Sequence, residues 1–217
     1  MKVKKVIIAT LSIALWGCGT VNNALVEKTK TNEYYRIFDI RTTADRQTVA
    51  EAASNGLGKN VNNAQEATLI PSFVTPPDEP GRFKLVNQFE GTRMAAFAAM
   101  GGGSVGFKTA TCDGAVWTAK AHRDSNSLNL TACLFQYKQG YHLDLYGVFT
   151  KKEGGLMQIS RSMANAMVGT PEEWVEKTFL DIVRNIRKVT KAELVLLEAQ
   201  PKQTGTPWLD ISPPQSH

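Results

Sequence analysis

The chain has 217 residues, of which 42% are hydrophobic and 21% are charged, and its formal net charge is +5. This is the composition of a globular protein, and it excludes a collagen, a coiled coil and a largely disordered chain. The length suffices for a hydrophobic core without the disulfides or metals that chains under about 40 residues need. We therefore expect a single folded domain.

The N-terminus has the pattern of an export signal. Lys2, Lys4 and Lys5 precede an apolar run that extends from Val6 to Trp16, and no acidic residue interrupts it. The run is shorter than the roughly 20 apolar residues that a membrane-spanning helix needs, and a basic start followed by a short apolar core is typical of a secretory signal peptide. We expect residues 1–17 to be removed after export.

Leu15, Trp16, Gly17 and Cys18 stand where this signal ends. They resemble the lipobox of bacterial lipoproteins, in which a Leu, two further residues and a Cys direct diacylglyceryl transfer to the thiol. The resemblance covers only the first 18 residues and implies that Cys18 carries two or three acyl chains, a stable membrane anchor. Because Gly19 rather than Asp follows, the sorting rule of the family implies transfer to the outer membrane of a Gram-negative cell.

Processing changes the charge and sets the expected domain boundaries. The signal takes three of the 25 basic residues and none of the 20 acidic ones, which leaves a net charge of +2 and no case for a nucleic-acid partner. We expect a polar, lipidated tether over residues 18–32 and one globular domain over residues 33–200. Residues 201–217 contain four prolines and are predicted to be a flexible tail.

Two cysteines remain once Cys18 is assigned to the lipid. Cys112 and Cys133 form an even pair in a chain destined for an oxidising compartment, so we predict a disulfide between them. Such a bridge would constrain the unfolded chain by roughly 3 kcal/mol in the entropic account. A redox or nucleophilic pair is disfavoured, because there is no C-x-x-C motif and neither thiol has a His or Lys beside it in the sequence.

The first part of the domain alternates between strand and helix signals. Aromatic and β-branched residues predict a strand over 34–40, and the helix formers of 43–54, closed by an Asn-Gly pair, predict a helix. A short strand is expected over 67–70. Prolines then indicate a loop over 71–81, and the residues 82–86 are expected to re-enter the sheet.

An alanine-rich segment over 92–100 is followed by three glycines, which predicts a short helix with a glycine terminus. The glycines lack the residues of a P-loop or a dinucleotide fingerprint, so we interpret them as a turn. Exposed apolar patches mark interaction sites. We therefore take Met94, Phe97, Met100 and Phe107 as candidate partner-facing residues.

The centre of the chain predicts an antiparallel meander. In its third and fourth segments leucines alternate with polar residues, which indicates a sheet with one covered face and one wetter face. Turn residues separate the four segments, as in β-hairpins. The predicted strands are 104–111, 115–124, 128–138 and 141–151.

A strong helix signal follows the meander. Thr170 is suited to cap a helix, Pro171 to its first position and Glu173 to its third. One apolar face then recurs at helical spacing, so this helix should lie across the covered face of the sheet. The residues of that face are Val175, Phe179, Ile182, Val183 and Ile186.

These elements predict an α+β fold, in which an antiparallel meander packs against the C-terminal amphipathic helix and a second helix as a two- or three-layer sandwich. Short elements over 156–160 and 162–168 and a strand over 191–198 complete the expectation. The order of elements is similar to that of the PsbP/Mog1-like envelope lipoproteins. That resemblance implies a fold and no particular activity.

Three residues are candidates for chemistry. His142 and Asp144 are two apart on a predicted strand and share its wetter face, where His122 of a nearby strand could join them as a ligand-binding or acid–base group. The common hydrolase, protease and dinucleotide motifs are absent from the sequence. We expect no metal and no cofactor, and a non-catalytic protein is favoured over an enzyme.

The sequence leaves two main functions open. The leading hypothesis is a non-catalytic, lipid-anchored envelope protein that binds a protein partner or supports assembly of an envelope complex. The alternative is a periplasmic or surface protein that binds a ligand, or hydrolyses one, through the His122, His142 and Asp144 face. A surface-exposed adhesion protein is a third option.

Overall fold

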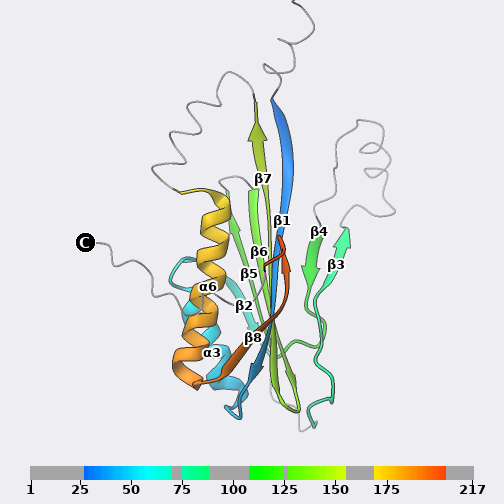
Figure 1. The fold of residues 1–217 in the computed structure, drawn as a ribbon, viewed down its shortest axis with the longest axis vertical. Helices are drawn as coiled ribbons and strands as arrows, with labels where there is room; N and C mark the ends of the chain where they lie inside the picture. Colours follow the sequence, from blue (N-terminus) through cyan, green and yellow to red (C-terminus); the bar gives the residue numbers. More distant parts are fainter. Residues whose placement is uncertain (1–26, 70–74, 88–107, 125–126, 155–168, 204–217) are drawn as a thin grey trace, which may run out of the picture. The chain divides into compact units, whose positions relative to one another are not determined.

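A computed structural model describes residues 27–69, 75–87, 108–124, 127–154 and 169–203 (Figure 1). Two helices and eight strands lie in these residues, and they confirm the α+β class. The helices are α3 (Arg46–Leu57) and α6 (Pro171–Thr190). The strands are β1 (Lys28–Arg41), β2 (Gln65–Thr68), β3 (Lys84–Asn87), β4 (Lys108–Thr111), β5 (Trp117–Arg123), β6 (Leu128–Tyr137), β7 (Gly140–Glu153) and β8 (Glu193–Gln200).

The chain divides into two compact units. The larger unit comprises Thr31–Phe149 and Pro171–His217. The smaller unit comprises the residues before these and Thr150–Thr170, and in it the Nζ atom of Lys152 lies 2.8 Å from Oε1 of Glu27. The sheet core, both helices and the polar sites described below belong to the larger unit.

Six strands form an antiparallel sheet in the order β2-β5-β6-β7-β1-β8. The strands β5, β6 and β7 are the meander that the sequence predicts, with Phe135 of β6 opposite His142 of β7. Gly140 opens β7 with a φ of 149°, and a Cβ atom there would overlap the carbonyl oxygen of Ile40. Only glycine fits this turn beside β1.

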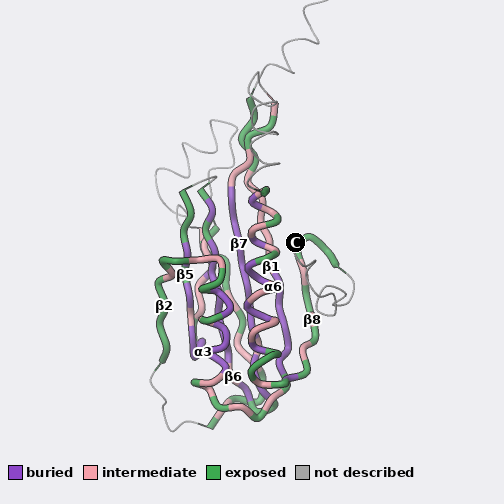
Figure 2. The backbone as a smooth tube through the Cα atoms, turned by 90° about the vertical axis from the view of Figure 1, so that its left-hand side faces the viewer, coloured by how far each residue is buried: buried purple, intermediate pink, exposed green. Residues whose placement is uncertain are grey.

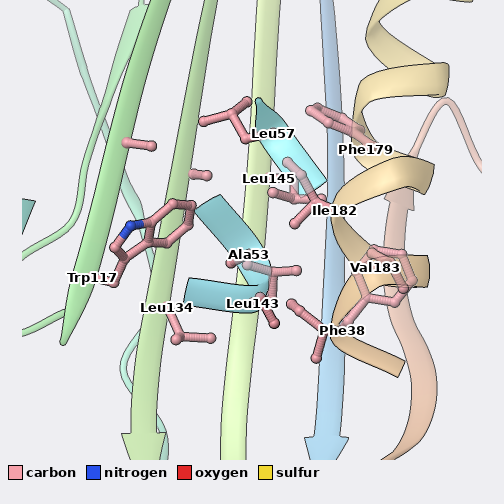
Figure 3. Close-up of a cluster of buried hydrophobic side chains, with 14 of the residues drawn as sticks. Phe38, Ala53, Leu57, Trp117, Leu134, Leu143, Leu145, Phe179, Ile182 and Val183 are labelled. Carbon is pink, nitrogen blue, oxygen red and sulfur yellow. The ribbon is translucent and has the colours of Figure 1, made fainter. Parts of the chain in front are cut away.

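Both helices cover one face of the sheet, which we call the helix face. The apolar residues of the meander strands alternate onto it and meet the buried sides of α3 and α6. Figure 3 shows this core, to which the sheet contributes Phe38, Trp117, Leu134, Leu143 and Leu145 and the helices contribute Ala53, Leu57, Phe179, Ile182 and Val183.

The predicted apolar face of α6 is confirmed, because all five of its expected core residues are buried. Figure 2 shows the buried stripe of this helix turned toward the central strands, while the edge strands β2 and β8 are largely exposed. The helix α3 starts at Arg46, because the carboxylate of Asp45 accepts from the backbone N–H of Thr48 at 3.0 Å and caps it. It packs closely on α6, and a Cβ on Gly56 would lie 2.5 Å from the Cα of Ile182.

The opposite face of the sheet, which we call the outer face, is covered in part by a second sheet of β3 and β4 (Figure 1). This corrects two expectations, because β3 and β4, which lie where the strands 82–86 and 104–111 were expected, do not join the large sheet. Their strands pair with each other, Lys84 opposite Thr111. The turn at Gly114, with a φ of 80°, leads the chain from the small sheet to the large one instead of closing a hairpin.

Several boundaries differ from those expected. The strand β1 begins at Lys28, inside the predicted tether, and β8 runs two residues beyond the predicted strand. The elements expected over 92–100, 156–160 and 162–168 lie outside the described residues, as does most of the predicted tail. Neither helix in the described part of the chain is long and apolar enough to cross a membrane.

Candidate functional site

The polar side chains of the outer face gather in two places. The first, which we call the Asp39 cluster, joins Asp39 and Arg41 of β1 with Tyr137 of β6 and His142 of β7. The hydroxyl of Tyr137 donates to Oδ1 of Asp39 at 2.6 Å, and Nε of Arg41 donates to Oδ2 at 3.0 Å. The Nε2 atom of His142 lies 3.7 Å from the same Oδ1.

Burial sets the electrostatics of this cluster. It raises the pKa of Tyr137 to about 12, helped by the hydrogen bond to Asp39. It lowers the pKa of His142, against the opposing charge of Asp39, and so favours the neutral imidazole. The ring of Tyr137 meets that of His142 edge-on at 5.5 Å. Both carboxylate oxygens of Asp39 therefore already accept a hydrogen bond from a neighbouring side chain, and the cluster does not present an open acid–base pair to a substrate.

Asp144 is not on a wet surface, which corrects the expectation for this part of β7. It is 1% exposed, its Oδ2 accepts from the backbone N–H of Phe83 at 2.8 Å, and its Oδ1 has no hydrogen-bond partner among the described residues. Burial raises its pKa to about 6. The residues 75–83, which we call the cover segment, close this part of the outer face, with Gly81 against the ring of Phe135.

Polar contacts hold the cover segment in place. The backbone N–H of Lys138 donates to the carbonyl of Pro77 at 2.9 Å, and its Nζ lies 2.6 Å from Oδ1 of Asp78. The guanidinium of Arg82 donates twice to the carboxylate of Glu198 on β8, at 2.6 and 2.5 Å. The alternation of the sequence could not reveal this cover, since its residues come from a proline-rich stretch.

The predicted disulfide is present. Cys112 follows β4 and is bonded to Cys133 of β6, with their Cα atoms 5.5 Å apart. Both residues pack with Ala115 and Phe135 in a small apolar cluster under the cover segment. The bridge fixes the β3–β4 sheet on the outer face.

His122 lies apart from the other two candidate residues. It is opposite Asn129 of β6, which in turn is opposite Val148 of β7. Val148 is six residues from His142 along the same strand, about 20 Å at the rise of an antiparallel strand. The structure thus brings His142 near Asp144 but does not bring His122 to them.

His122 instead borders the second polar place, a groove of about 550 Å³, which we call the lysine groove. Cross-strand neighbours build it, with Lys120 opposite Thr131 and Thr131 opposite Tyr146. The imidazole of His122 contacts Oδ1 of Asn129 at 2.9 Å through Nδ1. These residues alternate with core residues along each strand, which is why they share one face.

Two further elements close the groove. The start of β4 contributes Lys108 and Thr109, and the chain at β2 contributes Asn63 and Gln65. Neither could be placed there from the sequence, because Asn63 and Gln65 are distant from the meander along the chain and β4 was expected to be one of its strands. The sequence does show that Lys120 and His122 are two residues apart on one predicted strand, and such residues lie on the same face of a sheet.

The predicted partner-facing residues Met94, Phe97, Met100 and Phe107 lie outside the described residues, and so does Cys18. The structure does describe the two strands on either side of the segment 88–107, since β3 ends at Asn87 and β4 starts at Lys108. Two large apolar side chains of β3 are exposed there, Leu85 at 39% and Val86 at 45%. The described residues contain no group of three or more His, Cys, Asp or Glu able to hold a metal ion.

Comparisons with protein families, with curated protein sequences and with solved structures found no match to this chain.

Proposed function

We propose that the chain is a non-catalytic, lipid-anchored protein of the cell envelope that binds a protein partner through its β3–β4 arm. The arm consists of β3, β4 and the residues 88–107 between them. The lipobox resemblance at Cys18 supports the anchor, and the basic, apolar stretch before it supports export. The sorting rule of that family favours the outer membrane.

The observation that carries the proposal is the construction of the arm. Its two strands pair along four residues each, and the bridge from Cys112 to Cys133 ties its base to the large sheet. Leu85 and Val86 are exposed on β3, and Met94, the first apolar residue of the 94–107 stretch, follows Val86 by eight positions in the sequence. An apolar segment that two paired strands hold, themselves fixed to the large sheet by a disulfide, is suited to contact another protein.

The Asp39 cluster supports a structural role for the candidate acid–base residues. A general base needs an accessible oxygen or nitrogen near its substrate. Here Asp39 already accepts from Tyr137 and Arg41, Asp144 is buried beneath the cover segment, and His142 is held in its neutral form. These contacts stabilise the packing of β1, β6 and β7.

The anchor is tested by following the protein through membrane fractionation with labelled palmitate. We expect the unchanged chain to be labelled and to sediment with outer membranes. Cys18→Ala should remove both the label and the sedimentation. Gly19→Asp is the matched control, because it should keep the label but retain the protein at the inner membrane. Labelling of the Cys18→Ala variant would contradict the anchor.

The partner surface is tested by cross-linking in intact cells, followed by purification through a C-terminal tag. We expect one protein at comparable abundance, and its loss when Leu85 and Val86 are both changed to Asp or when Met94 and Phe97 are changed to Ala. Val189→Asp is the control, since Val189 is 50% exposed on α6 and distant from the arm in sequence. Unchanged capture by folded arm variants would overturn the assignment.

A further inference from the structure

We infer that the lysine groove binds an anionic saccharide, a small hydroxyl-rich molecule that carries a carboxylate or a phosphate. The inference is independent of the protein-partner function, because the groove and the apolar segment of the arm use different residues. It follows from the volume of the groove, its charge and the kind of polar groups that line it.

The groove has a closed floor and polar sides. Thr131, Tyr146 and Val148 form the floor, and each of them is at most 5% exposed. Lys120 and His122 of β5 are exposed beside it. A volume of about 550 Å³ is within the range of small-molecule sites, roughly 300 to 1,000 Å³.

The charge of the groove selects an anion. Lys108 and Lys120 both line it, and no Asp or Glu is among the described residues that do so. Two carboxylates lie nearby, since Lys108 Nζ is 3.5 Å from Oε1 of Glu33 and His122 Nε2 is 3.1 Å from Oδ1 of Asp124. Lys120 has no ion-pair partner within the described part of the chain, so its ammonium group is available to a carboxylate or phosphate.

The remaining polar groups suit hydroxyls. Asn63 and Gln65 present amides, which both donate and accept hydrogen bonds, and Thr109 and Thr131 present hydroxyls. The amide of Asn129 also lines the groove, where it is bonded to His122 and to the carbonyl of Ser127. A sugar hydroxyl also donates and accepts, so this set complements a ring of hydroxyls better than it complements an apolar ligand. Lys108 and Lys120 additionally favour a ligand that carries a negative charge.

The walls of the groove are fixed before a ligand arrives. The hydroxyl of Tyr146 donates to the carbonyl of Lys108 at 3.3 Å and so ties β4 to the floor. The bridge from Cys112 to Cys133 holds the other end of β4. A site built on paired strands loses little conformational entropy on binding, which favours affinity for a small ligand.

The test is calorimetric titration of the full-length, lipidated protein in detergent at low ionic strength. The probes are glucuronate and glucose 1-phosphate as anionic saccharides, glucose as the neutral analogue, and inorganic phosphate as the bare anion. We expect saturable binding of both anionic saccharides, at least about tenfold weaker binding of glucose and of phosphate, and weakening by added salt. Lys120→Gln should weaken the anionic saccharides about tenfold or more.

Two variants keep the result interpretable. Lys138→Gln is the matched control, because Lys138 is also an exposed lysine but lies in the turn between β6 and β7 and does not line the groove. This variant should bind the anionic saccharides as tightly as the unchanged protein. Asn129→Asp places a carboxylate in the groove without removing a lysine, and should weaken glucuronate more than glucose. The inference is overturned if no anionic saccharide binds, if glucose or phosphate binds as tightly, or if folded Lys120→Gln binds within about twofold of the unchanged protein.

Discussion

The two faces of the large sheet are stabilised in different ways. On the helix face, buried residues from the sheet and from α3 and α6 make one continuous apolar cluster. On the outer face there are two small clusters, centred on Tyr146 and on Phe135, together with a disulfide, ion pairs and the Asp39 cluster. The helix face is specified by burial, whereas the outer face depends on particular cross-links.

This difference separates stability from binding. The lysine groove and the arm are both found on the outer face, away from the continuous apolar layer. Specific cross-links can hold such a face without filling it. If the comparison is right, equal substitutions on the two faces should have unequal effects on stability.

The largest effect is expected from truncating an aromatic residue of the helix face. Phe179 is 1% exposed in the main cluster, so Phe179→Ala should lower the free energy of unfolding by about 4 kcal/mol. Phe83→Ala is the matched substitution on the outer face, where Phe83 is only partly buried, and it should cost about half as much. Denaturant unfolding measures both, and equal losses would contradict the comparison.

The helix face was the more predictable of the two. Leucine alternation in β6 and β7 and the 3.6-residue period of α6 directly reflect burial, and these elements were placed correctly. Which strand pairs with which was harder to predict from the sequence, because β4 has the same residue pattern as a strand of the meander. Its pairing with β3 depends on the turn at Gly114 and on contacts distant in sequence.

The second prediction concerns the ion pair of the helix face, in which the side chain of Arg36 is buried and that of Glu176 is 34% exposed. The guanidinium of Arg36 is fully buried, bonds to Glu176 of α6 and donates to the carbonyls of Tyr35 and Gln200 at 2.8 Å each. Glu176→Ala should cost about 3 kcal/mol, because it leaves a buried cation without its carboxylate.

The double variant Arg36→Met with Glu176→Ala is the control for that result. It removes the buried charge together with its partner, and it should recover part of the lost stability. Chemical unfolding of the two single variants and the double variant forms a cycle. A double variant that loses the sum of the single losses would show that the pair does not act as a unit.

The third prediction tests the disulfide of the outer face. Replacing Cys112 and Cys133 together by Ala should lower stability by between about 2 and 3 kcal/mol, since the bridge closes a loop of 21 residues in the unfolded chain. The loss should be accompanied by faster amide exchange in β3 and β4 and little change in α6. Uniform exchange changes in all three elements would contradict a local role for the bridge.

The fourth prediction concerns the pH dependence that Asp144 imposes. Its pKa in the folded protein is about 6, above the ordinary 3.8, so the folded state holds this proton more firmly than the unfolded state. Stability should therefore fall as the pH rises from about 4 to about 6, and stay lower above that. The full shift corresponds to at most about 3 kcal/mol.

Asp144→Asn removes this penalty. We expect a gain of about 2 kcal/mol near neutral pH, less than the full amount because the new amide N–H has no acceptor, and no gain near pH 4. Asn55→Gln on the exposed side of α3 changes no titratable group, and it is the control that should leave the pH profile unchanged. Thermal unfolding across this pH range measures both variants, and a parallel profile for Asp144→Asn would contradict the assignment.

The sites were less predictable than the fold for a physical reason. The period of a strand tells which face a side chain occupies but not which residues from distant segments cover that face. Thus His142 and Asp144 were correctly placed together on one face, and the cover segment that buries Asp144 was missed. The same limit hid Asn63 and Lys108, which complete the groove around His122.

The smallest effect is expected from the exposed ion pair of the outer face. Arg82 and Glu198 form two hydrogen bonds, at 2.6 and 2.5 Å, yet their side chains are 52% and 44% exposed. Water already solvates both charges, so Glu198→Gln should cost under about 1 kcal/mol. The loss should shrink further in high salt, whereas the loss in Glu176→Ala should persist because its guanidinium partner is inaccessible to ions.

This contrast in salt response tests the difference between the two faces most directly, because it sets one Arg–Glu pair against another and varies only the solvent. The Arg82 hydrogen bonds lower the pKa of Glu198, so the small contribution of the pair is present at neutral pH and lost as the pH falls through that lowered value. A salt-insensitive loss of several kcal/mol in Glu198→Gln would mean that the cover segment is held as firmly as the helices. In that case the outer face would owe its stability to burial too.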